Sequence, residues 1–289
     1  MRWILVGIAL LLLAAAVVLL ARWLRGLEPV AEFLESFPGS YPLPDAAPVG
    51  LPAWLGWQHF FNVFFLVLIV RTGLASRAEK RPPALWTSKR NRKRRMSLTV
   101  WLHLSLDAFW IANGVIYVVL LFATGQWMRI VPTSWDVIPN AISAGLQYAS
   151  LDWPLENSWV NYNSLQQLSY FATVFVAAPL AIATGARMSS FWPRQADRLN
   201  RAYPFAVAQA VHLPVMIYFI AFTVVHVGLV LTTGALRNLN HMYASRDAAD
   251  WVGFGIFALS LLVIAAAWAL IRPAVIDRIA AAFGEVTRR

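Results

Sequence analysis

Six long apolar segments leave few folds open to this chain. Each segment reaches or exceeds the ~20 residues that a helix needs to cross the hydrocarbon core of a bilayer. No strand-like alternation of apolar and polar residues runs through them, and helices are therefore the only plausible spanning elements. The segments cover residues 3–24, 51–74, 98–124, 165–186, 205–233 and 251–271. The sequence thus predicts an all-α integral membrane protein with six transmembrane helices.

The composition agrees with this class and excludes several kinds of metal site. Hydrophobic residues make up 59% of the 289 residues, charged residues only 13%, and the mean hydropathy is +0.58. A soluble domain of this length does not have such a composition. The absence of cysteine excludes disulfides, thiolate-ligated clusters, zinc-thiolate sites and prosthetic groups attached through thioether bonds. Histidine, carboxylate and methionine side chains remain as metal ligands.

The basic residues predict the orientation of the helices. Most of the 24 Lys and Arg residues fall in the loop 71–95, the loop 187–201 and the tail 272–289, Arg194 and Arg289 among them. Basic loops tend to stay in the cytoplasm, so we expect both termini to be cytoplasmic in a multi-pass protein of the cell (plasma) membrane. The basic run 89–95 is compatible with nucleic-acid binding, but we interpret it as a topology determinant on anionic headgroups. The expected partner is the lipid bilayer, and no nucleic acid.

Three parts are expected along the chain. Residues 1–50 hold the first transmembrane helix, which we interpret as retained rather than as a signal peptide, and an extended, proline-rich outer linker. Residues 51–234 form a four-helix core, and residues 235–289 add an outer loop, the last helix and a basic cytoplasmic tail. The outer loop 126–163 contains a candidate interfacial helix around 138–149. The cytoplasmic loops show no signature of a folded domain.

Four of the five histidines lie in the apolar segments, at two matched depths. His212 and His226 are 14 residues apart in one segment, so they share a helix face and lie about 21 Å apart along it. The predicted topology places His59 and His226 near the outer face, and His103 and His212 near the cytoplasmic face. The pairs His59/His226 and His103/His212 are the only ones that keep both partners at one depth.

This arrangement suits two haems, each of which takes two axial ligands from opposite sides at one level. A single histidine in a membrane helix can instead hydrogen-bond a neighbouring carbonyl group. Four histidines at two matched depths favour function, because intramembrane ionisable groups are costly. We therefore predict two bis-histidine b-type haems (haem b) in a four-helix haem-binding bundle. His241, in the outer loop, is expected to be a solvated residue, with contact to a haem edge or a quinone as the alternative.

Several stretches carry a resemblance to a known family. They are 57–60 (Trp-Gln-His-Phe), His103, 163–166, Tyr170 with the run Pro179 to Thr184-Gly185, and the pair His212/His226. In these stretches the chain resembles the prokaryotic di-haem cytochrome b subunits of membrane-bound hydrogenases, formate dehydrogenase and thiosulfate reductase. The resemblance covers residues 51–234, and the His212/His226 spacing is its most specific element.

The resemblance implies the same two haem pairs, quinone or menaquinone chemistry close to the cytoplasmic haem, and a partner outside the cytoplasm. That partner would be an extracytoplasmic redox enzyme subunit of the molybdenum or hydrogenase type. The resulting expectation is an electron-transfer subunit of an oxidoreductase complex in a respiratory chain. It would carry electrons between the quinone pool and this enzyme. A stand-alone quinone oxidoreductase acting on superoxide or a metal, and a haem-free transporter or assembly protein, remain alternatives.

Four further residues are candidates for supporting roles. Asp107 lies one turn from His103 on the same face and could exchange protons with a quinone, or serve only as a structural hydrogen-bonder. Gln209 lies one turn before His212 and could bond a quinone carbonyl or backbone groups. Arg187 and Arg201 could pair with the propionates of the inner haem, or act only as charges at the membrane boundary.

Overall fold

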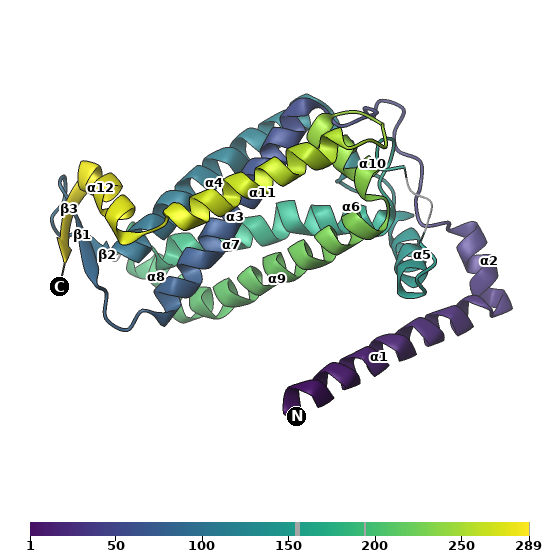
Figure 1. The fold of residues 1–289 in the computed structure, drawn as a ribbon, viewed down its shortest axis with the longest axis horizontal. Coiled ribbons are helices and arrows are strands. Elements are labelled where there is room, and N and C mark those ends of the chain that lie inside the picture. The colour runs from purple at the N-terminus through teal and green to yellow at the C-terminus, as the bar shows by residue number, and fades with distance from the viewer. Residues whose placement is uncertain (154–156, 194, 289) are drawn as a thin grey trace. The chain divides into compact units, whose positions relative to one another are not determined.

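The fold was examined in a computed structural model that describes residues 1–153, 157–193 and 195–288. Arg194 and Arg289, two of the basic residues used above, lie outside the described residues, as do 154–156 of the long outer loop. Six helices are long and apolar enough to cross a membrane, which confirms the helices expected from the sequence (Figure 1). They are α1 (Arg2–Arg25), α3 (Ala53–Ala78), α4 (Leu98–Ala123), the composite helix Ser164–Met188, α9 (Phe205–Thr232) and α11 (Val252–Leu270).

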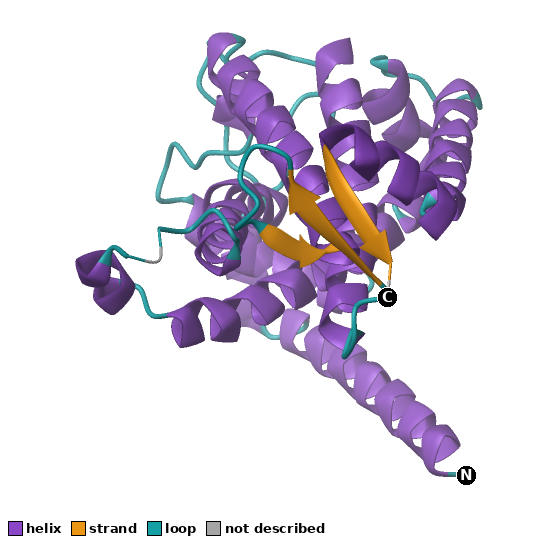
Figure 2. Ribbon diagram, turned by 90° about the vertical axis from the view of Figure 1, so that its left-hand side faces the viewer, coloured by secondary structure: helices purple, strands orange, loops and turns teal. Residues whose placement is uncertain are grey.

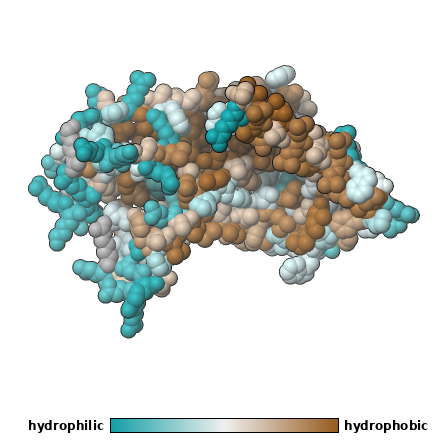
Figure 3. All heavy atoms as spheres, turned by 90° about the horizontal axis from the view of Figure 1, so that it is seen from below, coloured by the Kyte–Doolittle hydropathy of each residue, from teal (hydrophilic) through white to brown (hydrophobic). Residues whose placement is uncertain are grey.

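The surface of these helices is suited to lipid. Figure 3 shows apolar side chains over most of the helical surface, with hydrophilic side chains gathered towards the ends. Large apolar residues on every one of the six helices are exposed, for example Leu11, Phe109 and Val224. Exposed apolar flanks of this extent are expected where hydrocarbon, rather than water, surrounds a helix.

The chain divides into two compact units, which are described separately. Unit 1 comprises residues 1–50 and 121–176, and unit 2 comprises residues 51–120 and 177–289. Both α4 and the composite helix Ser164–Met188 contribute residues to each unit. The composite helix consists of α6 (Ser164–Phe171), a π-helical segment η2 (Ala172–Ala177) and α7 (Ala178–Met188).

Unit 1 contains two short helices besides α1 and α6. The helix α5 (Val137–Ala149) confirms the helix expected around 138–149. The expectation of an extended linker was wrong for its first part, because α2 (Glu28–Ser36) is helical. Pro29 lies in the first turn of α2, where its missing N–H group would have no intrahelical partner in any case. The 3₁₀ turn η1 (Gln126–Arg129) completes the unit.

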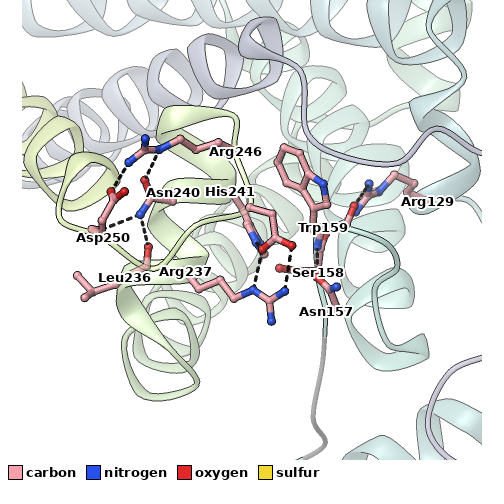
Figure 4. A network of polar contacts seen from close by, with 11 residues as sticks. Arg129, Asn157, Ser158, Trp159, Leu236, Arg237, Asn240, His241, Arg246 and Asp250 are labelled. Atoms are coloured by element: carbon pink, nitrogen blue, oxygen red, sulfur yellow. Dashed lines mark hydrogen bonds and ion pairs between the residues drawn. The ribbon is translucent and has the colours of Figure 1, made fainter.

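Arg129, at the end of η1, links the loops of unit 1. Its side chain is 1% exposed and donates to the carbonyl groups of Gly50 (3.2 Å) and Trp159 (3.0 Å). A further bond goes to the carbonyl of Ser158 (Figure 4). The guanidinium also lies 4.8 Å from the centre of the Tyr162 ring. This side chain is therefore committed to backbone acceptors within its own unit.

Unit 2 carries a small sheet at one end, which we call the sheet end. The strands β1 (Ala84–Ser88), β2 (Arg95–Ser97) and β3 (Gly284–Arg288) form an antiparallel sheet in the order β2-β1-β3 (Figure 2). The helix α12 (Pro273–Phe283) leads into β3. The described fold is thus helical with one small sheet, which the sequence did not predict.

The sheet forms because the loop and the tail bury apolar side chains together. Ala84 and Trp86 of β1 pack with Leu98, Ile276 and Ala280 in one core cluster. Trp86 also donates through Nε1 to the carbonyl of Ala280 at 3.1 Å. Neither segment alone contains enough apolar residues to indicate a strand. The two segments form this core only together, although they lie almost 200 residues apart in sequence.

The opposite end of unit 2, which we call the η3 end, is closed by α10 (Ala235–Leu239) and a π-helical turn η3 (Asn240–Ala244). His241 in this turn is 2% exposed, and its Nε2 lies 2.8 Å from Oδ1 of Asp247. Arg237 donates to the same carboxylate (Figure 4). The expectation of a solvated His241 was therefore wrong, because its segment folds back into a buried turn and a carboxylate satisfies the ring.

Candidate functional site

Unit 2 brings the four histidines of the apolar segments together in two pairs. His59 on α3 and His226 on α9 face each other at the η3 end, with 6.2 Å between ring centroids and 53° between ring planes. His103 on α4 and His212 on α9 lie close enough to interact electrostatically at the sheet end. Both pairings agree with those expected from the depth of each residue.

The ring of His103 is oriented by a threonine on the neighbouring helix α3. Oγ1 of Thr72 lies 3.0 Å from Nδ1 of His103 and donates to the carbonyl of Leu68 at 2.9 Å. The hydroxyl group can donate its one proton to this carbonyl and accept a hydrogen bond from Nδ1–H of His103. This contact is compatible with the tautomer that keeps a free lone pair on Nε2, the form that a metal ion requires.

His212 is oriented in the same way from α7. Oγ1 of Thr184 lies 2.8 Å from Nδ1 of His212 and donates to the carbonyl of Leu180 at 2.6 Å. Thr184 and Thr72 are both almost completely buried, so water does not compete for either hydroxyl group. The two rings at the sheet end are therefore oriented by equivalent contacts from two different helices.

A glycine follows each of these threonines and gives the ring space. A Cβ atom at Gly73 would lie 3.2 Å from Cε1 of His103, and one at Gly185 would lie 3.7 Å from Cε1 of His212. The imidazole of each histidine thus packs directly on the backbone of the neighbouring helix. The repeated Thr-Gly pair is a sequence signal that could have identified Thr72 as a functional residue.

Asp107 also lies at the sheet-end pair, as its position on α4 predicts. Its Oδ2 atom is 3.6 Å from Nε2 of His103, and its carboxylate interacts electrostatically with His212 as well. A carboxylate next to Nε2 of His103 is placed to exchange protons with a group bound there. Its role toward a quinone stays a prediction.

The other three candidates lie elsewhere. Gln209 is exposed on α9 and Arg201 is exposed on α8 (Asp197–Ala202), so the structure does not bring them to the histidines. Arg187 donates through Nε to the carbonyl of Tyr203 at 2.7 Å and stacks on the rings of Trp192 and Phe205. These contacts anchor the end of α7, and the propionate role predicted for Arg187 and Arg201 stays a prediction.

The pair at the η3 end has different surroundings. Nδ1 of His59 is buried and has no hydrogen-bond partner, and the edge of its ring meets Tyr243 of η3 at 5.7 Å. His226 stacks on Phe222 with 5.5 Å between centroids and 5° between planes. The backbone of η3 approaches Gly56 so closely that a Cβ atom there would meet the carbonyl oxygen of Met242 at 2.5 Å. Tyr243 was not identified from the sequence, because its segment was expected to be a solvated loop.

An apolar layer separates the two histidine pairs. Ala177, Val215 and Phe219 form its buried centre, with Leu66 and Trp110 packed against it. The rings of Trp110 and Phe219 meet edge to face, with 6.1 Å between centroids. Because these side chains carry few polar groups, no chain of polar groups within this layer connects the two histidine pairs.

The pairs fit a metal bound within a larger prosthetic group better than a bare ion. In the described ranges, no group of three or more His, Asp or Glu residues is placed to hold a metal ion. Two imidazoles that offer Nε2 from opposite helices instead match the axial ligands of haem iron, whose other four ligands come from the porphyrin. Comparisons of the chain with protein-family models, with curated proteins and with solved structures give no match.

Proposed function

We propose that this chain is a di-haem b-type cytochrome subunit. It carries electrons across the membrane between the quinone pool and an extracytoplasmic redox enzyme. The observation that carries the proposal is the pairing of four intramembrane histidines at two levels, with the sheet-end rings fixed by Thr72 and Thr184. Such contacts at Nδ1 are expected of metal ligands, whose second nitrogen is almost always hydrogen-bonded.

The four histidines divide the work between two haem sites. His59 and His226 would hold one haem at the η3 end, and His103 and His212 the other at the sheet end. Haem iron supplies one-electron chemistry. The protein orients the imidazoles, excludes water between the helices and keeps the two sites apart with the layer around Trp110.

The basic residues of the sheet end favour the cytoplasmic side for that end. Asp107 would then exchange protons with a quinone close to the cytoplasmic pair, since it is an ionisable group next to Nε2 of His103. The η3 end, with its folded outer loop, would face the partner enzyme.

Haem stoichiometry in single variants tests this proposal. We expect two b-type haems per chain, with His59→Ala or His226→Ala removing one and His103→Ala or His212→Ala removing the other. Ile217→Ala, an exposed position between the two histidines of α9, is the matched control and should retain both. Retention of both haems by His212→Ala would refute the pairing. A purified chain without the reduced-minus-oxidised α-band would support the haem-free alternative.

Copurification tests the partner. A second redox subunit should purify with the chain from its native membrane and exchange electrons with quinone through it. A chain that purifies alone and couples superoxide oxidation to quinone reduction would instead support a stand-alone oxidoreductase.

A further inference from the structure

Buried polar atoms without hydrogen-bond partners gather in one part of unit 2. Among the described residues, Nε1 of Trp54, Oε1 of Gln58, Nδ1 of His59 and Nδ2 of Asn113 are buried and unpartnered. All four lie on the halves of α3 and α4 towards the η3 end. At the sheet end, by contrast, both histidine Nδ1 atoms are satisfied by threonines.

Ring contacts place Trp54 at the interface between α3 and α4. Trp54 meets Tyr117 with 6.3 Å between centroids, and further along Phe65 stacks on Phe109 at 6.1 Å. The two helices therefore run antiparallel and side by side. Gln58 lies one turn beyond Trp54 and Asn113 lies one turn before Tyr117, so each amide is on its helix one turn from this ring contact.

These amides are deeply buried without being paired to each other. Gln58 and Asn113 are each 8% exposed, and neither is bonded through the atoms named above. A buried donor or acceptor without a partner destabilises a protein, and hydrocarbon offers no water to replace the missing bond. Two such amides, each one turn from the contact between Trp54 and Tyr117, form an arrangement that a polar ligand would satisfy.

We propose that Trp54, Gln58 and Asn113 bind the headgroup of a quinol or quinone between α3 and α4. Nε1 of Trp54 and Nδ2 of Asn113 can only donate, and so they match the oxygen atoms of such a headgroup. The amide of Gln58 can accept from the hydroxyl of a quinol, or rotate and donate to the carbonyl of a quinone. The rings of Trp54 and Tyr117 supply an aromatic wall for the headgroup ring.

The surroundings suit a ligand that arrives from the lipid. Next to the amides on the same helices, Phe61, Val115 and Ile116 are exposed apolar residues along which an isoprenoid tail can lie. Gln58 directly precedes His59, so the headgroup site adjoins the histidine pair of the η3 end. This inference rests on the proposed function for its substrate class. It adds a site distinct from the one near Asp107, at the opposite histidine pair.

Photolabelling tests the site in the full chain. The purified protein in quinone-free nanodiscs is exposed to a short-tailed azidobenzoquinone, reduced or oxidised, and the labelled peptides are mapped by mass spectrometry. We expect label on the segments around Trp54–Gln58 and Asn113–Tyr117. Gln58→Leu and Asn113→Leu should each reduce that label about tenfold, the effect of losing one buried hydrogen bond. Ile217→Ala, at an exposed apolar position of α9, should leave it unchanged.

Two further readouts separate binding from structure. Because Gln58→Leu and Asn113→Leu replace unpartnered polar atoms with apolar ones, the ligand-free variants should melt at the same or a higher temperature. A lower melting temperature would assign these residues a structural role and overturn the proposal. Loss of the haem nearest His59 in either variant would also overturn it, because the amides would then serve the haem.

Haem content and the position of the label together separate this site from the proposed function. Two haems per chain with label only around residues 103–107 would refute the site and leave the function standing. Label at Trp54–Gln58 in a chain that binds no haem would refute the function and leave the site standing.

Discussion

Oγ1 of Thr184 lies 2.8 Å from Nδ1 of His212 while its own proton is donated to the helix that carries it. This contact orients the imidazole and is compatible with a proton on Nδ1. Thr72 makes the equivalent contact to His103 from a different helix. Two buried threonines therefore orient the two rings. Their contacts are the main physical support for the proposal that the sheet-end pair binds a metal.

Removal of the Thr184 hydroxyl should weaken haem binding at the sheet-end pair without leaving a cavity between α7 and α9. Thr184→Val keeps the shape of the side chain but leaves Nδ1–H of His212 without an acceptor, a cost of about 1–3 kcal/mol. We expect haem affinity at that pair to fall about 10–100-fold, the usual effect of losing such a partner. Redox titration should also show a higher midpoint potential, since the imidazole becomes a poorer donor. Thr184→Ser should restore both values. Equal affinity and potential in all three proteins would contradict this role.

The two glycines beside the rings should respond differently to one methyl group. A Cβ atom at Gly73 would lie 3.2 Å from the ring of His103, which is a tight contact, whereas the 3.7 Å contact at Gly185 is ordinary. Gly73→Ala should therefore displace His103 and change the absorption spectrum of the haem it holds. Gly185→Ala should leave the spectrum unchanged and gain up to ~1 kcal/mol of helix propensity. Identical spectra of the two variants would contradict the close packing at Gly73.

Asp247 should give the η3 end a characteristic acid sensitivity. Hydrogen bonds from Arg237 and His241 lower its pKa from 3.8 to about 2. A lowered carboxyl pKa stabilises the fold above the unfolded pKa, and this stabilisation is lost as the pH falls through the folded pKa. The contribution should thus be complete above about pH 4 and disappear towards pH 2. Thermal unfolding as a function of pH should show a smaller loss in this window for Asp247→Asn than for the parent protein. Parallel curves would show that the contact does not stabilise the fold.

The sheet should depend on the absence of a side chain at Gly284. A Cβ atom there would overlap the indole of Trp86, which lies in the core of the sheet end. Gly284→Val should therefore separate β3 from β1 and loosen the exposed basic loop 89–95, whose Lys89 is bonded to carbonyl groups of α12. Limited trypsin digestion should then cut this loop several times faster than in the parent protein. Glu285→Ala, at an exposed position of the same strand, is the control and should leave the rate unchanged. Equal cleavage rates for Gly284→Val and the control would show that the pairing of β3 with β1 does not protect the loop from trypsin.

The helices were predictable because they depend on hydropathy alone. Each of the six segments matches an observed helix within a few residues, as with 98–124 and α4 (Leu98–Ala123). The proximity of the histidine pairs was also predictable, since alternating topology fixes the depth of each residue along its helix. The extended linker and the solvated His241 were wrong. Residues Glu28–Ser36 form a local helix, and Asp247, six residues further along the chain, pairs with a buried His241.

What the sequence by itself determined is the number of spanning helices and the level of each histidine, because both follow from apolar length and the order of crossings. Only the tertiary structure decided how the rings are held. Thr72 and His103 are 31 residues apart, and Thr184 and His212 are 28 residues apart. Their contact depends on the rotation of each helix about its axis, which the packing of several helices sets together. The same holds for the unpartnered amides of Gln58 and Asn113, which both lie one turn from the contact between Trp54 and Tyr117 only because α3 and α4 lie side by side.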